Sequence, residues 1–296
     1  MDRHMDKLNT LAKILLAALA GVVIRVVGVL VVPASEQTIL QPSRFAEAGA
    51  LPWLTGLYAL VGYAVVAGFF LIVGPRISGA KYMQGLKYGG SLAVIAAVFA
   101  FEPLPHLAQT DYFVNAAVAG LAIFAVGFAV AMLLGDEVNE IRYYRTIFHI
   151  IPTNAVAVLF FIGRMIQYYA LDIYSEASGQ RMIWTAVAGL TLAAVMNWYH
   201  NKRPMHSRVL KVLLLAVVVL GWNILLHYLY LPLVYRVDIV DLFTRAGIDI
   251  LAVALAVLLY MPNGDGREPE IIVPKRYGFE ETSQGSPNNE PEDASS

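Results

Sequence analysis

The chain of 296 residues contains no cysteine and few charged residues. The absence of cysteine excludes disulfide bonds, thiolate metal sites and cysteine nucleophiles. Lysine, arginine, aspartate and glutamate together make up 15% of the sequence, whereas a soluble domain carries about 25%. The formal net charge of −1 gives no basic excess, so we expect no nucleic acid as a partner.

Sequence motifs of several common chemistries are missing as well. There is no His-Glu-x-x-His zinc motif, no P-loop, no Gly-x-Gly-x-x-Gly and no nucleophile elbow. The six histidines are scattered, and no two of them lie four residues apart on one apolar stretch. We therefore expect no metal and no cofactor, and the sequence favours a non-enzymatic function over catalysis.

Long apolar stretches dominate what is present. Hydrophobic residues make up 58% of the chain, and the mean hydropathy is +0.61. A helix needs about 20 apolar residues to cross a bilayer. Eight stretches have roughly this length: 11–32, 52–74, 86–103, 113–134, 148–170, 182–199, 210–231 and 244–261. The sequence therefore predicts an all-α, polytopic integral membrane protein, with the lipid bilayer as its partner and the plasma membrane as its location.

The distribution of positive charge predicts the orientation. With the N-terminus in the cytoplasm, fifteen lysine and arginine residues fall on the cytoplasmic side and four in the outer loops: Arg44, Arg181, Arg236 and Arg245. Loops rich in lysine and arginine remain in the cytoplasm. Eight spans with both termini cytoplasmic follow from this distribution.

The two halves of the membrane region resemble each other weakly. Asp111-Tyr112-Phe113 precedes the fourth span, and Asp241-Leu242-Phe243 precedes the eighth. Chance is the alternative explanation, since helices rich in Ala, Val and Leu look alike. Duplication predicts two parallel four-helix repeats, residues 1–135 and 136–261, and transporters built from repeats hold their substrate at the interface between them.

Residues 262–296 differ in composition from the rest. This segment is rich in Pro, Gly, Ser, Asn and Glu, and it holds eight acidic and three basic residues. Such a segment buries too little apolar surface to fold alone. We predict a disordered acidic cytoplasmic tail, and we regard it as the candidate contact for a protein partner.

Three charged residues lie in the interior of the predicted spans, away from their ends: Arg25, Arg164 and Asp249. Each costs about 3 kcal/mol or more at the centre of a bilayer unless it is paired or hydrated. A helical rise of about 1.5 Å per residue places all three at similar depth in the outer half of the membrane. We expect Arg164 and Asp249 to form a charge pair.

Further polar side chains lie at the same level. Asn223 and His227 are four residues apart and share one helix face, and Gln167 and Tyr168 follow Arg164 by about one turn. We expect these groups to converge on a polar cavity that opens outward. The candidate substrate-binding residues are Arg25, Arg164, Gln167, Tyr168, Asn223, His227 and Asp249.

Two arginines against one aspartate make this site net positive, which suits a small anion or a lipid headgroup. Glu102 or Asp111 would neutralise the site if either reached into it. The favoured function is a small secondary transporter or permease. The alternative is that Arg164 and Asp249 form a purely structural salt bridge and that the protein has no binding site there.

Two other functional classes remain open. A membrane-embedded enzyme acting on a lipid or prenyl substrate would need an acid/base pair, for which Asp249 and His227 are the candidates. A non-catalytic membrane subunit or sensor would signal through the acidic tail.

Overall fold

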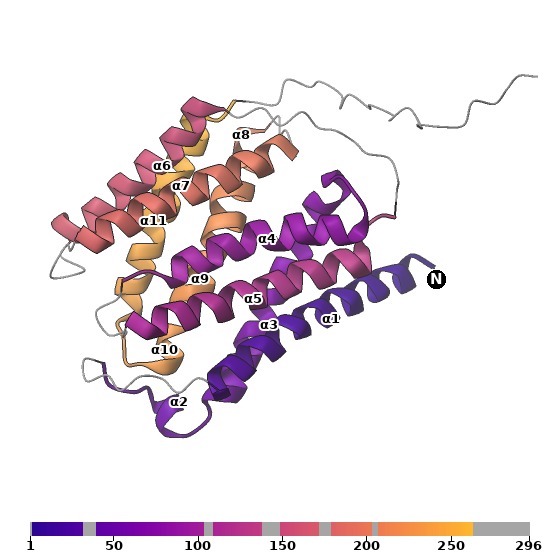
Figure 1. Ribbon diagram of the computed structural model, residues 1–296, viewed down its shortest axis with the longest axis horizontal. Helices are drawn as coiled ribbons and strands as arrows, with labels where there is room; N and C mark the ends of the chain where they lie inside the picture. The colour runs from indigo at the N-terminus through magenta and orange to yellow at the C-terminus, as the bar shows by residue number, and fades with distance from the viewer. Residues whose placement is uncertain are drawn as a thin grey trace, which may run out of the picture.

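A computed structural model describes residues 2–31, 40–103, 109–137, 149–171, 179–202 and 207–262, and these residues form an all-α structure (Figure 1). Eight helical segments in them are long and apolar enough to cross a membrane. This confirms the predicted spans and makes the chain a multi-pass integral membrane protein. The tail 263–296, together with Arg142, Arg145 and Arg203 of the predicted cytoplasmic loops, lies outside the described residues.

The first half contributes four spans and two short elements. The spans are α1 (Asp2–Val31), α3 (Leu51–Val73), α4 (Lys81–Ala100) and α5 (Gln109–Leu134). The short elements are α2 (Arg44–Glu47) and the 3-10 turn η1 (Gly74–Arg76). A further short helix, α10 (Leu231–Val234), belongs to the second half.

The second half contains two spans that include π-helix. The fifth span is α6 (Ile150–Met165) followed by the π-helix η2 (Ile166–Ala170), and the sixth is α7 (Gly179–Lys202). The seventh combines α8 (Arg208–Val212), the π-helix η3 (Leu213–Gly221) and α9 (Trp222–Tyr228). The eighth is α11 (Ile239–Tyr260), which begins earlier than predicted because the side chain of Asp238 accepts a hydrogen bond from the Val240 amide at 2.8 Å.

Apolar side chains cover the outside of the bundle as well as its interior. Trp53, Ile151 and Leu251 are 85%, 72% and 70% exposed. Such a surface in water would drive association, whereas acyl chains solvate it readily. Helices satisfy their backbone hydrogen bonds internally, so they can present this surface to lipid.

Helices of the same half pack mainly on one another. α1 packs on α3 and α5, and α4 on α5, while α6 packs on α7 and α11, and η3 on α11. Contacts between the halves run from α4 to α7 and α9 and from α3 to α9. Figure 1 shows the indigo-to-magenta first half beside the second half.

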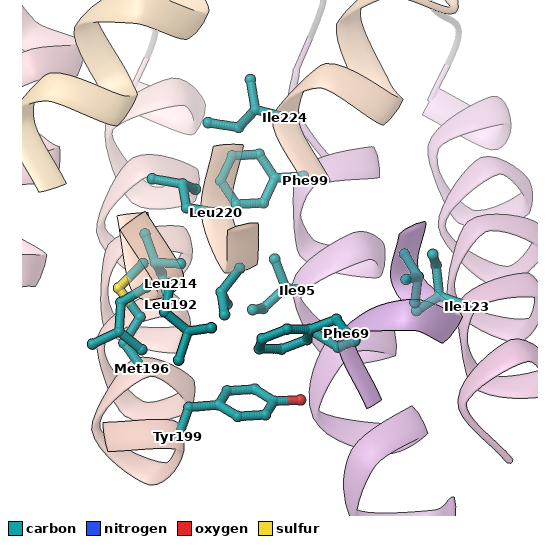
Figure 2. Close-up of a cluster of buried hydrophobic side chains, with 14 of the residues drawn as sticks. Phe69, Ile95, Phe99, Ile123, Leu192, Met196, Tyr199, Leu214, Leu220 and Ile224 are labelled. Atoms are coloured by element: carbon teal, nitrogen blue, oxygen red, sulfur yellow. The ribbon is translucent and has the colours of Figure 1, made fainter. Parts of the chain in front are cut away.

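A hydrophobic core lies where the two halves meet (Figure 2). Phe69 of α3 and Ile95 and Phe99 of α4 belong to one cluster with Leu192 of α7 and Leu220 of η3. Packing of this kind holds helices together in lipid, where the hydrophobic effect between them is absent.

The alternation of the spans places the described ends of the helices at two opposite ends of the bundle. At one end Lys81 Nζ donates to Glu137 Oε1 at 2.8 Å, and the buried Lys211 Nζ donates to the Pro262 carbonyl at 2.6 Å. At the other end the Ser43 amide donates to the Val234 carbonyl at 2.9 Å. We call these the inner and the outer end, after the orientation that the charge distribution predicts.

Candidate functional site

Arg164, near the end of α6, is fully buried together with acidic partners. Its Nη1 donates to Glu102 Oε1 at 2.6 Å, and its Nη2 donates to the Tyr228 hydroxyl at 2.8 Å. Nη2 also lies 2.7 Å from Asp249 Oδ2, an ion pair without hydrogen-bond geometry. The expected pair of Arg164 and Asp249 is therefore present, and Glu102 joins it.

Aromatic rings surround the guanidinium group of Arg164. Its Cζ lies 4.9 Å from the centroid of the Trp184 ring, 5.5 Å from that of Phe160 and 6.0 Å from that of Tyr228. The negative faces of such rings attract a desolvated cation. Trp184 is fixed in turn, because its Nε1 donates to the Val98 carbonyl at 2.7 Å. The rings thus help to solvate an arginine that has no access to water.

The π-helix η2 directs two consecutive polar side chains into this cluster. Gln167 and Tyr168 are 0% and 3% exposed, although successive residues of a regular helix point in different directions. Gln167 Nε2 donates to Asp249 Oδ1 at 2.8 Å, and the Tyr168 hydroxyl lies 3.3 Å from Thr185 Oγ1. π-Helical turns occur frequently at functional sites.

Two carboxylates face one guanidinium here, so the net positive site that the sequence predicts does not form around Arg164. Glu102, two residues beyond the end of α4, is 2% exposed and supplies the second carboxylate. Its Oε2 also accepts a hydrogen bond from the Tyr228 hydroxyl at 3.2 Å. We call Arg164, Glu102, Asp249, Gln167, Tyr168 and Tyr228 the Arg164 cluster.

Arg25 does not belong to the Arg164 cluster. Its Cζ lies 4.5 Å from the centroid of the Tyr230 ring. Together with Asn223 and His227, Arg25 lines a cavity of about 50 Å³. The other residues that line this cavity, which we call the Arg25 cavity, are Tyr58, Ala59, Tyr63, Ala96, Phe99, Ala119, Ile123 and Leu226. The seven predicted site residues are thus divided between two places rather than gathered in one.

The Arg25 cavity offers hydrogen-bond donors and a positive charge. Among the described residues, no carboxylate forms an ion pair with Arg25. Asn223 uses its Nδ2 to donate to the Val219 carbonyl at 2.6 Å, and the Tyr58 hydroxyl donates to the Leu225 carbonyl at 2.8 Å. The guanidinium group, the His227 ring and the second N–H of the Asn223 amide are the groups suited to bind an anion.

The Arg25 cavity and the Arg164 cluster are neighbours. Phe99 lines the cavity, and its ring centroid lies 6.0 Å from those of both Phe160 and Trp184, which surround Arg164. His227 of the cavity interacts electrostatically with Glu102. A charge that enters the cavity therefore acts on the ionised groups of the cluster.

The sequence alone does not identify several residues of the Arg164 cluster and of the Arg25 cavity. Tyr58, Tyr63 and Tyr228 lie in apolar stretches, where an aromatic residue near the outer boundary is equally expected as an interfacial anchor. Glu102 is identifiable only as a group that would neutralise the site. The useful signal is the pair Glu102-Pro103, an acidic residue at the very end of an apolar stretch.

No protein-family model, curated protein or solved structure matches this chain significantly.

Proposed function

We propose that the protein is a permease for small anions and that the Arg25 cavity is its binding site. One observation carries this proposal. A guanidinium group lines a cavity between the helices, and no carboxylate of the described residues forms an ion pair with it.

The energetics favour an anion beside Arg25. An unpaired charge inside a bilayer costs about 3 kcal/mol or more. The contact with the Tyr230 ring stabilises the Arg25 cation by only about 0.5–2 kcal/mol. A bound anion would supply the missing stabilisation, and the His227 ring and Asn223 amide line the same space.

The location of the cavity also supports transport. It is lined by α1, α3, α4, α5 and α9, and so includes helices of both halves. Each half repeats three pairings: first span with second, third with fourth and first with fourth. These pairings support the proposal that residues 1–135 and 136–261 are parallel repeats, and repeat interfaces are where transporters hold their substrates.

The geometry does not favour an enzyme that uses Asp249 and His227 as acid and base. Asp249 is fully buried against Arg164 and Gln167 and does not line the cavity that holds His227. The two groups therefore do not face one substrate-sized space. The acidic tail as a contact for a protein partner, the plasma membrane location and the cytoplasmic termini stay predictions.

The cavity volume suits a small ligand. About 50 Å³ accommodates chloride or formate. Gluconate and the phosphate of a lipid headgroup with its substituents are larger. We therefore expect a free small anion rather than an anchored lipid phosphate.

Chloride NMR line broadening on the full-length protein in neutral-lipid nanodiscs tests binding. We expect the wild type to broaden the chloride signal, formate to reverse the effect and gluconate to leave it unchanged. Arg25→Gln should abolish the broadening. The control Arg236→Gln removes an exposed arginine of the outer end that pairs with Glu47, and it should bind as the wild type does.

Equal broadening by the Arg25→Gln variant and the wild type would place the anion elsewhere and refute the site. Loss of chloride binding in anionic-lipid nanodiscs would assign the cavity to a lipid headgroup instead. Chloride efflux from proteoliposomes then tests transport. We expect the Arg25→Gln variant to be slower by about tenfold or more, the effect of losing about 1.4 kcal/mol of binding. Binding without efflux in the wild type would contradict a permease.

A further inference from the structure

We propose that the Arg164 cluster is a proton-binding site in which one proton resides on the carboxyl group of Asp249. This proposal concerns the cluster alone and does not depend on the anion cavity.

The count of charges indicates one proton. Arg164, Glu102 and Asp249 are buried together and sum to −1 when both carboxylates are ionised. Arg245, which acts electrostatically on Glu102, pairs with Asp241 and so adds no net charge. An uncompensated charge without access to water is strongly unfavourable, and a bound proton removes it.

The hydrogen bonds identify the carboxylate that takes the proton. Both oxygens of Glu102 accept hydrogen bonds, from Arg164 at 2.6 Å and from the Tyr228 hydroxyl at 3.2 Å. Asp249 Oδ1 accepts a hydrogen bond from Gln167 at 2.8 Å, and its Oδ2 lies 2.7 Å from Arg164 Nη2 in an ion pair that lacks hydrogen-bond geometry. Asp249 is the less stabilised anion and is therefore the group that binds the proton.

Gln167 is suited to both protonation states of Asp249. In the structure its Nε2 donates to Asp249 Oδ1, while its buried Oε1 has no partner among the described residues. The two ends of an amide differ little in shape, and which one faces a neighbour is set by hydrogen bonding. When the amide turns over, Oε1 accepts a hydrogen bond from a protonated Oδ1, in exchange for the contacts of Nε2 with Asp249 at 2.8 Å and with the Arg245 carbonyl at 3.4 Å.

The other elements packed around Asp249 bring few further charges. The titratable or charged groups that face the cluster are Arg164, Tyr168, Glu102, His227, Tyr228 and Arg245. The π-helix η3, which packs on α11, contains no ionisable residue. Arg164, Glu102 and Asp249 contact one another directly, and a single proton on Asp249 balances their charges.

Infrared spectroscopy of the full-length protein in nanodiscs, with gluconate as the anion, tests this site. A buried protonated carboxyl group gives a carbonyl stretch that is resolved from those of amides and carboxylates. We expect this band at neutral pH and its loss in Asp249→Asn. Glu102→Gln should also remove it at neutral pH, because Arg164 then balances an ionised Asp249.

Three controls separate this proton from other groups. Glu47→Gln changes a half-exposed carboxylate of the outer end and should keep the band. Gln167→Leu should keep it but shift its frequency, because the hydrogen bond to the carboxyl group is lost. Arg25→Gln should keep the band, so failure of the anion site and failure of the proton site are distinguishable.

The proposal is overturned if the wild type shows no such band at any pH where it is folded. The proposal is equally overturned if the band persists in Glu102→Gln. This second test remains available even if the Asp249→Asn variant does not fold. Tryptophan fluorescence during heating checks the folding of each variant.

Discussion

Arg164 contacts two acidic side chains, Glu102 and Asp249, so a variant without Arg164 leaves a buried negative charge without a cation. Arg164→Met should destabilise the protein by about 3–5 kcal/mol, because buried charges lose their partner. The double variant Arg164→Met/Asp249→Leu should remain unstable, since Glu102 is then buried without a cation. Adding Glu102→Leu should bring the thermal unfolding temperature in detergent back near that of the wild type. Full recovery in the double variant would mean that Glu102 contributes nothing to this cluster.

The sequence locates these side chains along the membrane normal but not around the bundle. Counting residues along a helix correctly predicts that Arg164 and Asp249 meet, because both depths follow from the helical rise. The same count places Arg25 at their level, yet α1 packs on α3 and α5, and Arg25 meets Tyr230 instead. Direction around a helix axis depends on which neighbours it packs against, and that is decided only in the folded bundle.

The contact between α4 and α5 depends on glycine. A Cβ atom at Gly127 would lie 2.4 Å from the Cα of Gly89, which is closer than real atoms approach. Gly127→Ala should therefore push the helices apart and destabilise the protein by about 1–3 kcal/mol. The matched control is Gly90→Ala on α4, where a Cβ would meet nothing within 4 Å. Thermal unfolding of both variants in detergent checks this, and equal stability would contradict close packing at Gly127.

The helical spans are predictable as elements, whereas their irregularities are not. The stretch Leu213–Gly221 is uniformly apolar and contains no proline or other local signal for π-helix, yet it forms η3. The π-helix η2 is likewise invisible in the sequence and directs Gln167 and Tyr168 inward together. Such turns are selected by packing against neighbouring helices, so they follow from tertiary structure rather than from local preference.

The molecule as a whole has a predicted orientation that its lack of cysteine makes easy to test. Single cysteines at Ala48 and at Ala80, both exposed, mark the outer and the inner end. Because the chain has no native cysteine, labelling by a membrane-impermeant maleimide has no background from the protein itself. On intact cells we expect Ala48→Cys to react and Ala80→Cys to react only after the cells are opened. The reverse pattern would invert the topology.

Eight spans could be predicted at this scale because hydrocarbon imposes length and hydropathy on every crossing helix. The division of the polar residues between the Arg164 cluster and the Arg25 cavity could not be predicted. Glu102 lies beyond the end of α4, and Phe99 separates the Arg25 cavity from Arg164. In the Arg164 cluster the charged side chains pair with one another, whereas in the Arg25 cavity a cation faces open space. This difference is the basis for assigning ligand binding to the Arg25 cavity.

The most direct test of this assignment is the anomalous scattering of bromide in crystals of the full-length protein grown in bromide. We predict a bromide peak inside the bundle within contact distance of the Arg25 guanidinium, and its disappearance in Arg25→Gln. A bromide peak beside Arg164, or an interior without any bromide, would contradict the account.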